Sequence, residues 1–132
     1  MPSNYTFNAS MSCSASSDSG YGASQSGSFS LNITQVNSVQ SGRKEIALTN
    51  TEICAAPSGT GMAGKIVYVR NLDKVNFLEV HSVATVDTNV IGILEPGEWL
   101  FTVLRDDQAV GASADTAVID IEYFAVEIDD QA

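Results

Sequence analysis

Hydrophobic and polar residues alternate strictly along the first part of the chain. Between residues 5 and 15 the odd positions carry Tyr, Phe, Ala, Met, Cys and Ala, whereas the even positions carry Thr, Asn and Ser. A period of two predicts a half-buried β-strand with a solvated or edge-like Ser/Asn face. Residues 29–36 repeat the alternation and predict a second strand. The Gly/Ser-rich segment 16–28 between them predicts a loop.

Further along, turn signals separate shorter apolar segments. Ser41-Gly42 predicts a turn, and Glu95-Pro96-Gly97-Glu98 predicts a type II turn, because proline fixes φ at its second position and glycine accepts a positive φ at its third. Residues 65–70 are apolar at consecutive positions, as expected for a central strand covered on both faces. The other expected strands are residues 45–49, 77–83, 90–94, 99–104 and 116–128.

The last of these strands changes its pattern near Tyr123-Phe124. Its apolar residues occupy odd positions up to Tyr123 and even positions from Phe124 onward. A bulge or bend at this point would restore one continuous core face, so we expect one there.

These patterns predict an all-β fold. No segment has the 3.6-residue periodicity of an amphipathic helix, and about eight short strands at this spacing favour a two-sheet antiparallel sandwich, with a jelly roll as the expected type. A chain of 132 residues fits one domain, residues 1–132. Within it, residues 1–40 form Ser/Asn-rich strands and a loop that could act as an attachment or subunit-exchange arm.

Charge is distributed unevenly. The net charge is −10; residues 1–72 carry four basic and three acidic side chains, and residues 73–132 carry two basic and 13 acidic ones. Such a field repels phosphate backbones, so no nucleic-acid partner is expected. The sequence shows no span of about 20 apolar residues and no signal peptide, so we expect no membrane partner and synthesis in a cytoplasm. Cys13 and Cys54 are then expected as thiols, with a disulfide between them as the alternative.

Candidate chemistry is sparse. His81 is the only histidine and shares a strand face with Phe77 and Glu79. A strand-face or interface role is expected, since zinc binding or catalysis needs further partners. Asp120 and Glu122 would lie side by side on one strand, where a calcium ion or an acid–base pair is conceivable and a solvated face is the simpler reading. We therefore expect no enzyme activity, no metal and no cofactor.

Aromatic residues offer a different kind of site. Trp99, Tyr21 and Tyr123 could stack on a sugar ring. Trp99 follows a tight turn in register with Phe101, which favours a core or subunit-interface position over an exposed platform. The residues expected at interfaces are Tyr5, Phe7, Met11, Trp99 and His81.

Part of the chain resembles small virion proteins of tailed bacteriophages. The resemblance consists of an ordered series of strand–turn–strand elements, residues 67–73, 76–80, 94–98 and 114–123. It implies a β-sandwich that decorates or cements the outer surface of a capsid, often as a homotrimer, bound to the major capsid protein or other virion proteins. The first 60 residues lie outside it. The alternative is a carbohydrate- or receptor-binding module of a phage tail or an adhesin.

Overall fold

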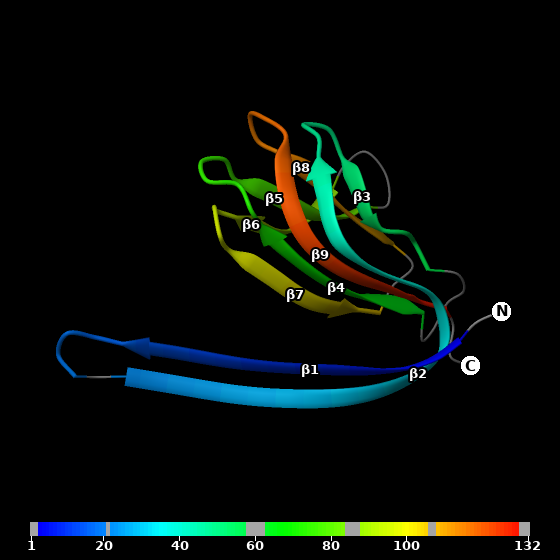
Figure 1. Ribbon diagram of the computed structural model, residues 1–132, viewed down its shortest axis with the longest axis horizontal. Coiled ribbons are helices and arrows are strands. Elements are labelled where there is room, and N and C mark those ends of the chain that lie inside the picture. The colour runs from blue at the N-terminus through cyan, green and yellow to red at the C-terminus, as the bar shows by residue number, and fades with distance from the viewer. Residues whose placement is uncertain (1–2, 21, 58–62, 84–87, 106–107, 130–132) are drawn as a thin grey trace.

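The computed structural model describes residues 3–20, 22–57, 63–83, 88–105 and 108–129, and within them the chain is entirely β-strand and loop (Figure 1). No helix in this part of the chain could cross a membrane. The strands are β1 (Ser3–Ser16), β2 (Gly22–Ile46), β3 (Thr51–Cys54), β4 (Gly64–Asn71), β5 (Leu78–Val83), β6 (Thr88–Leu94), β7 (Trp99–Leu104), β8 (Ala109–Ala114) and β9 (Ile119–Ile128). The expected all-β class is confirmed.

The strands form two antiparallel sheets, in the orders β1-β2-β9-β4-β7 and β3-β8-β5-β6. From β2 onward the pairing is nested: β5 pairs with β6, β4 with β7, β3 with β8, and β2 with β9. The chain therefore folds back on itself as one long double ribbon, and successive pairs alternate between the two sheets.

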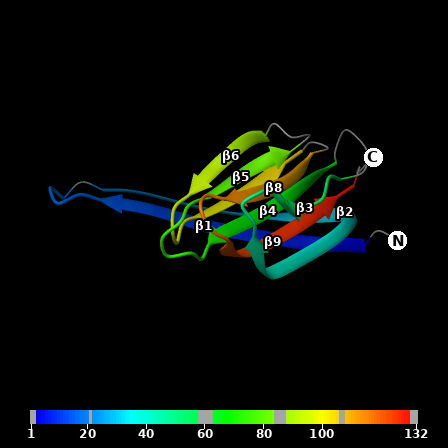
Figure 2. The same ribbon diagram turned by 90° about the horizontal axis from the view of Figure 1, so that it is seen from above.

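A shared core joins the sheets face to face in a sandwich-like arrangement (Figure 2). From the first sheet it receives Ile46, Val67, Val69, Ile119, Ile121 and Ala125. From the second it receives Ile53, Cys54, Leu78, Val80, Leu94, Val110, Ala112 and Ala114. Large-to-small changes among these buried side chains are expected to be the most destabilising in the molecule.

β9 is covered on both faces, which explains its change of pattern. Its odd residues Ile119 and Ile121 belong to the core between the sheets, and its even residues Val126 and Ile128 belong to a second buried cluster on the outer face. Pairing with β4 runs without a shift from Ile128 to Ile121. The bulge expected at Tyr123-Phe124 is therefore wrong, because no reversal of faces is needed where both faces are buried.

The N-terminal half departs most from expectation. Most of segment 16–28, expected as a loop, is paired strand, because β1 continues to Ser16 and β2 begins at Gly22. The turn expected at Ser41-Gly42 is also wrong, since both residues lie inside β2 and pair with Phe124 and Tyr123. Residues 29–36 and part of 45–49 thus belong to one long strand, and two short strands, β3 and β8, were not expected.

Two local predictions are confirmed. β4 is a central strand, paired with β7 on one side and β9 on the other. In the turn at residues 95–98, the Glu98 N–H donates to the Glu95 carbonyl at 3.0 Å, and Gly97 has φ of 85°. A positive φ at this position is what a type II turn requires.

Candidate interaction site on the hairpin arm

The most distinctive feature of the molecule is a long β-hairpin that projects beyond the sandwich. We call it the arm: β1 together with residues 22–36 of β2. We call the rest of the molecule, the two packed sheets, the body. The arm passes along the outer side of the first sheet, and its tip extends well past the edge of the body in both views (Figures 1 and 2). A two-stranded ribbon is marginal alone, so the arm depends on whatever lies against its faces.

The two faces of the arm differ in chemistry. Residues directly opposite each other share a face, and one face carries Phe7 opposite Leu31, Met11 opposite Gly27 and Ala15 opposite Ala23. The other face carries only short polar side chains: Thr6 with Asn32, Asn8 with Ser30, Ser10 with Ser28, Ser12 with Ser26 and Ser14 with Ser24. The arm is therefore an amphipathic ribbon with one apolar face.

Near its base, the apolar face of the arm packs on the body. The ring of Phe7 stacks on that of Phe101, with centroids 6.2 Å apart and planes 6° from parallel, and lies 5.7 Å from the ring of Phe124. Leu31 joins the same cluster, around buried Ile66. This contact fixes the base of the arm against the outer face of β9, β4 and β7.

Farther out, a groove separates the arm from the body. Its volume is about 860 Å³, within the range of ligand pockets. Its arm side is formed by Thr6, Phe7, Asn8, Ala9, Ser10, Met11, Gly27 and Ser28, and its body side by Tyr68, Trp99, Phe101 and Phe124. The groove is thus aromatic on the side of the body and mixed on the side of the arm.

Trp99 and Tyr68 lie next to each other on the body side of the groove. Their rings are 6.1 Å apart and tilted by 47°, and Trp99 remains 48% exposed. The Tyr68 hydroxyl donates to Glu122 Oε1 at 3.4 Å. Desolvation, together with the nearby Glu122 carboxylate, raises the pKa of Tyr68 above its usual value. Trp99 is therefore a half-exposed surface residue and not part of the core between the sheets.

The structure brings together three of the five residues expected at interfaces, and a fourth lies on the same face of β1. Phe7, Met11 and Trp99 line the groove. Tyr5, 46% exposed, lies on the same strand face as Phe7. Sequence reasoning did not select Tyr68 or Phe124, although the switch of apolar residues to even positions at Phe124 was the signal that a second face of β9 is covered.

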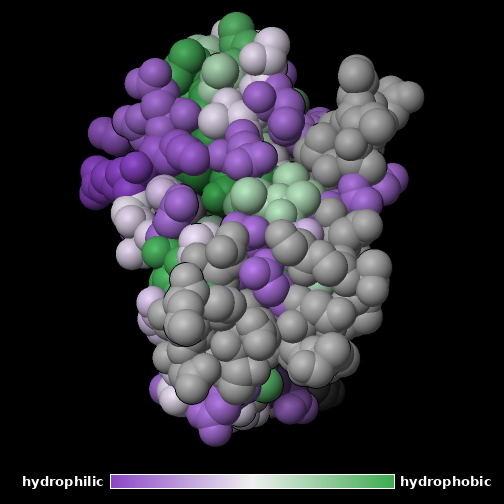
Figure 3. Space-filling model, turned by 90° about the vertical axis from the view of Figure 1, so that its right-hand side faces the viewer, coloured by the Kyte–Doolittle hydropathy of each residue, from purple (hydrophilic) through white to green (hydrophobic). Residues whose placement is uncertain are grey.

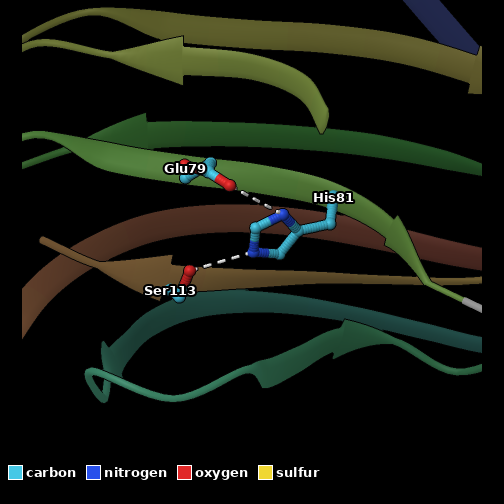
Figure 4. Close-up of polar contacts among 3 residues, drawn as sticks. All are labelled: Glu79, His81 and Ser113. Carbon is cyan, nitrogen blue, oxygen red and sulfur yellow. Dashed lines mark hydrogen bonds and ion pairs between the residues drawn. The ribbon is translucent and has the colours of Figure 1, made fainter. Parts of the chain in front are cut away.

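His81, the fifth residue, lies on the other sheet and is only 3% exposed. Its Nε2 is 2.9 Å from Ser113 Oγ and its Nδ1 is 3.4 Å from Glu79 Oε1 (Figure 4). The order carboxylate–imidazole–hydroxyl is that of a hydrolytic triad. However, Nδ1 makes no hydrogen bond, and Ser113 lies within the paired strand β8. None of these three residues lines the groove beside the arm, so the cluster lies apart from the candidate site.

The carboxylates do not assemble into an ion site among the described residues. Glu122 lies opposite Arg43 on β2 and Arg70 on β4, so its charge has basic neighbours. Asp120 is exposed and lies opposite Glu45. Asp106, Asp107 and Asp130, which also belong to the acidic clusters of the sequence, lie outside the described residues.

Both cysteines are free thiols, as expected, in opposite environments. Cys13 is exposed on the apolar face of the arm, and Cys54 is buried in the core. Desolvation raises the pKa of Cys54 to about 12, with a further contribution from the Glu127 carboxylate that nearby Lys65 partly offsets. Lys65 and Glu127 are both buried and lie directly opposite each other on β4 and β9.

The arm and the body differ in their charge. Residues 3–36 contain one charged side chain, Asp18, so almost all of the net charge of −10 lies on the body. On the end of the molecule that carries the termini, hydrophilic side chains gather over the described surface of the body (Figure 3). The arm is therefore nearly uncharged, whereas the body is strongly acidic.

Comparisons with protein-family models, with curated proteins and with solved structures found no match. The interpretation of the site therefore rests on the residues of this chain.

Proposed function

We propose that this protein is a structural assembly protein, a bacteriophage virion component that decorates or cements the outer surface of a capsid. One observation carries the proposal: the arm extends past the body with an apolar face that is covered only near its base. An exposed, uncharged apolar face of this kind marks a surface that is completed by another protein chain. The partners proposed are the major capsid protein or other virion proteins, and further copies of this chain.

The strand order supports a more specific fold, an eight-stranded jelly roll extended by β1. Nested pairing of β2 with β9, β3 with β8, β4 with β7 and β5 with β6 is the pattern produced when one long double ribbon is wrapped into two sheets. Viral capsid and lectin domains are among the proteins that use jelly rolls, so this fold is compatible with both candidate functions.

The acidic body supports an exterior position. A body that carries nearly all of the charge of −10 is repelled by packaged nucleic acid, whereas it is well solvated on an outer surface. The homotrimer implied by the resemblance to decoration proteins is part of the proposal, and sedimentation of the purified protein measures it.

The decisive experiment is the copy number of the chain in purified particles of its source. Quantitative mass spectrometry against the main shell protein should give a ratio set by shell symmetry. A few copies per particle would move the protein to a tail or a vertex, and absence from particles would overturn the virion proposal.

A shortened arm tests the route of attachment. Asn8 and Ser30 are directly opposite each other, so replacing residues 9–29 by Asn-Gly closes the hairpin early while Phe7 and Leu31 stay in place. We expect this variant to keep its folded body, as judged by circular dichroism, and to lose binding to particles that lack the protein. Ser12→Ala, on the polar face, is the control. Full binding by the shortened variant would contradict attachment through the arm.

The groove favours a second candidate, a carbohydrate- or receptor-binding module. Trp99 and Tyr68 present aromatic rings on its body side, and Asn8 and Ser10 supply polar groups on its arm side. Since Trp99 is the only tryptophan, its fluorescence reports directly on the groove. Saturable quenching or a blue shift with a saccharide, lost in Tyr68→Ala, would favour this candidate. No change across a saccharide panel would remove it.

A further inference from the structure

The apolar face of the arm continues beyond the part that the body covers. We call residues 11–16 and 22–27 the distal arm. Met11 is 52% exposed, and Cys13 and Ala15 are also exposed. This is the same face that, nearer the base, packs on the body through Phe7 and Leu31. The distal arm thus continues an established packing surface: Met11 and Gly27 line the outer part of the groove, and the residues from Cys13 to the tip lie beyond it.

Based on the proposed assembly function, we propose that the distal arm packs face to face on the distal arm of a second copy of this chain. The two arms are antiparallel and related by a twofold axis that passes between them near Cys13. This interface goes beyond a general role in assembly, because it names the partner and the register of contact.

In this register, the apolar face of one distal arm is complementary to the same face of the second copy. A twofold axis across the strands sets Cys13 of one copy opposite Cys13 of the other, and Met11 opposite Ala15. On β2 it sets Ala23 opposite Gly27, because Gln25 lies on the axis beside Cys13. The large Met11 thus meets the small Ala15, and the Cys13 and Ala23–Gly27 pairs are small, which leaves room at the centre for the longer Gln25 side chains.

Gln25 gives the strongest reason for an identical partner. It is directly opposite Cys13 and is therefore the polar exception on the apolar face of the distal arm. An amide buried by a partner needs both a donor and an acceptor. The same amide of a second copy, related by the twofold axis, supplies one of each.

Charge favours the same arrangement. The distal arm carries no charged side chain, and only Asp18 lies nearby, in the turn at the tip, whereas the bodies are strongly acidic. Antiparallel arms place the two bodies at opposite ends of the pair. Because the arm projects beyond the body, the like-charged surfaces stay apart while the uncharged faces meet (Figure 1).

The area available indicates a weak contact. Six residues of strand span about 20 Å, and a two-stranded ribbon is about 10 Å wide, so each copy contributes roughly 200 Å². Two copies then bury well under the ~1,200 Å² of a standard stable interface. Such a contact is transient for free protein and becomes stable where many copies are held on one particle.

Disulfide trapping detects a weak contact and reads its register. Under mild oxidation with copper phenanthroline, the full-length protein should form a Cys13–Cys13 dimer, and the Cys13→Ser variant should form none. The matched variant Cys13→Ser with Ser12→Cys moves the thiol by one residue to the polar face. This variant should form the cross-linked dimer at least 10-fold more slowly than the unchanged protein. Equal rates for the two proteins would overturn the proposal.

Sedimentation equilibrium of the unoxidised protein provides the second readout. Met11→Asp, on the apolar face, should weaken association at least 10-fold, and Ser12→Asp, the adjacent residue on the polar face, should leave it unchanged. Equal effects of both changes would indicate edge-to-edge pairing and overturn the proposal. A protein that stays monomeric even at its highest soluble concentration, or an association constant that Met11→Asp leaves unchanged, would also overturn it. A particle copy number set by shell symmetry would still support the proposed function in either case.

Discussion

The ring of Phe7, four residues into β1, stacks almost parallel on the ring of Phe101 in β7, with centroids 6.2 Å apart. This pair joins the two-stranded arm to the sandwich. It also determines which part of the apolar arm face is buried and which part remains available to a partner.

Removing this ring should loosen the arm. Phe7→Ala loses contact with Phe101 and Phe124, and because the side chain is half-buried we expect a loss of about 2 kcal/mol of unfolding free energy. Urea unfolding measures the loss. Asn8→Ala, the next residue on the polar face, is the matched control and should change stability by less than about 0.5 kcal/mol. A comparable loss in both variants would contradict the packing role of Phe7.

Asn71 is expected to be the most sensitive polar residue. Its buried side-chain amide donates to the carbonyls of Asn76 and Leu94, each at 2.9 Å, and its Oδ1 accepts from the Asp73 N–H at 2.8 Å. Asn71→Ala leaves these buried groups unpaired, so we expect a loss of about 3 kcal/mol in urea unfolding. Asn89→Ala, an exposed position on β6, should be nearly neutral.

Asp73 should make stability depend on pH at the acidic end. Backbone N–H groups of Asn76 and Val75 donate to its carboxylate at 2.6 and 2.9 Å and lower its pKa. A lowered folded-state pKa means that the stabilisation is complete above the unfolded value of about 3.9 and is lost as the pH falls through the folded pKa.

Thermal melts of Asp73→Ala across pH test this. The variant should melt below the wild type at pH 7, and the difference should shrink below about pH 4. Asp73→Asn, which keeps an acceptor oxygen but does not titrate, separates charge from hydrogen bonding. A melting difference that is constant down to pH 2 would contradict the role of the charge.

The two thiols should differ strongly in reactivity. Cys13 is exposed, whereas Cys54 is buried with a pKa of about 12 and so contributes almost no thiolate at neutral pH. One equivalent of Ellman's reagent should react rapidly with the native protein, and two equivalents should react in denaturant. Mass spectrometry should place the native label on Cys13; rapid labelling of Cys54 would show that the core opens readily.

Local sequence predicted several parts of the site well. The alternation from Tyr5 to Ala15 gave the apolar face of β1, and residues 95–98 gave the turn that places Trp99 at the start of β7. Both features depend on interactions within a few residues, namely the two-residue period of a strand and the backbone preferences of proline and glycine. The jelly-roll type, the virion role and the trimer remain proposals.

Other features depended on partners distant in sequence. Gly and Ser at residues 16–28 favour a loop in isolation, yet most of them are strand because β1 and β2 supply each other's backbone hydrogen bonds. The same reason explains β8, which pairs with β3 on one side and with β5 on the other. Composition indicates such strands poorly, because pairing and not side-chain preference stabilises them.

By itself, the sequence determined an all-β chain, an acidic second half and an amphipathic first strand, since alternation and charge are properties of the chain alone. Only the tertiary structure decided that β2 is one continuous strand, that β9 is buried on both faces and that Phe7, Tyr68 and Trp99 line one groove. The physical reason is that burial and pairing depend on which surfaces the folded chain brings together, and these surfaces come from residues as distant in sequence as Phe7 and Phe124.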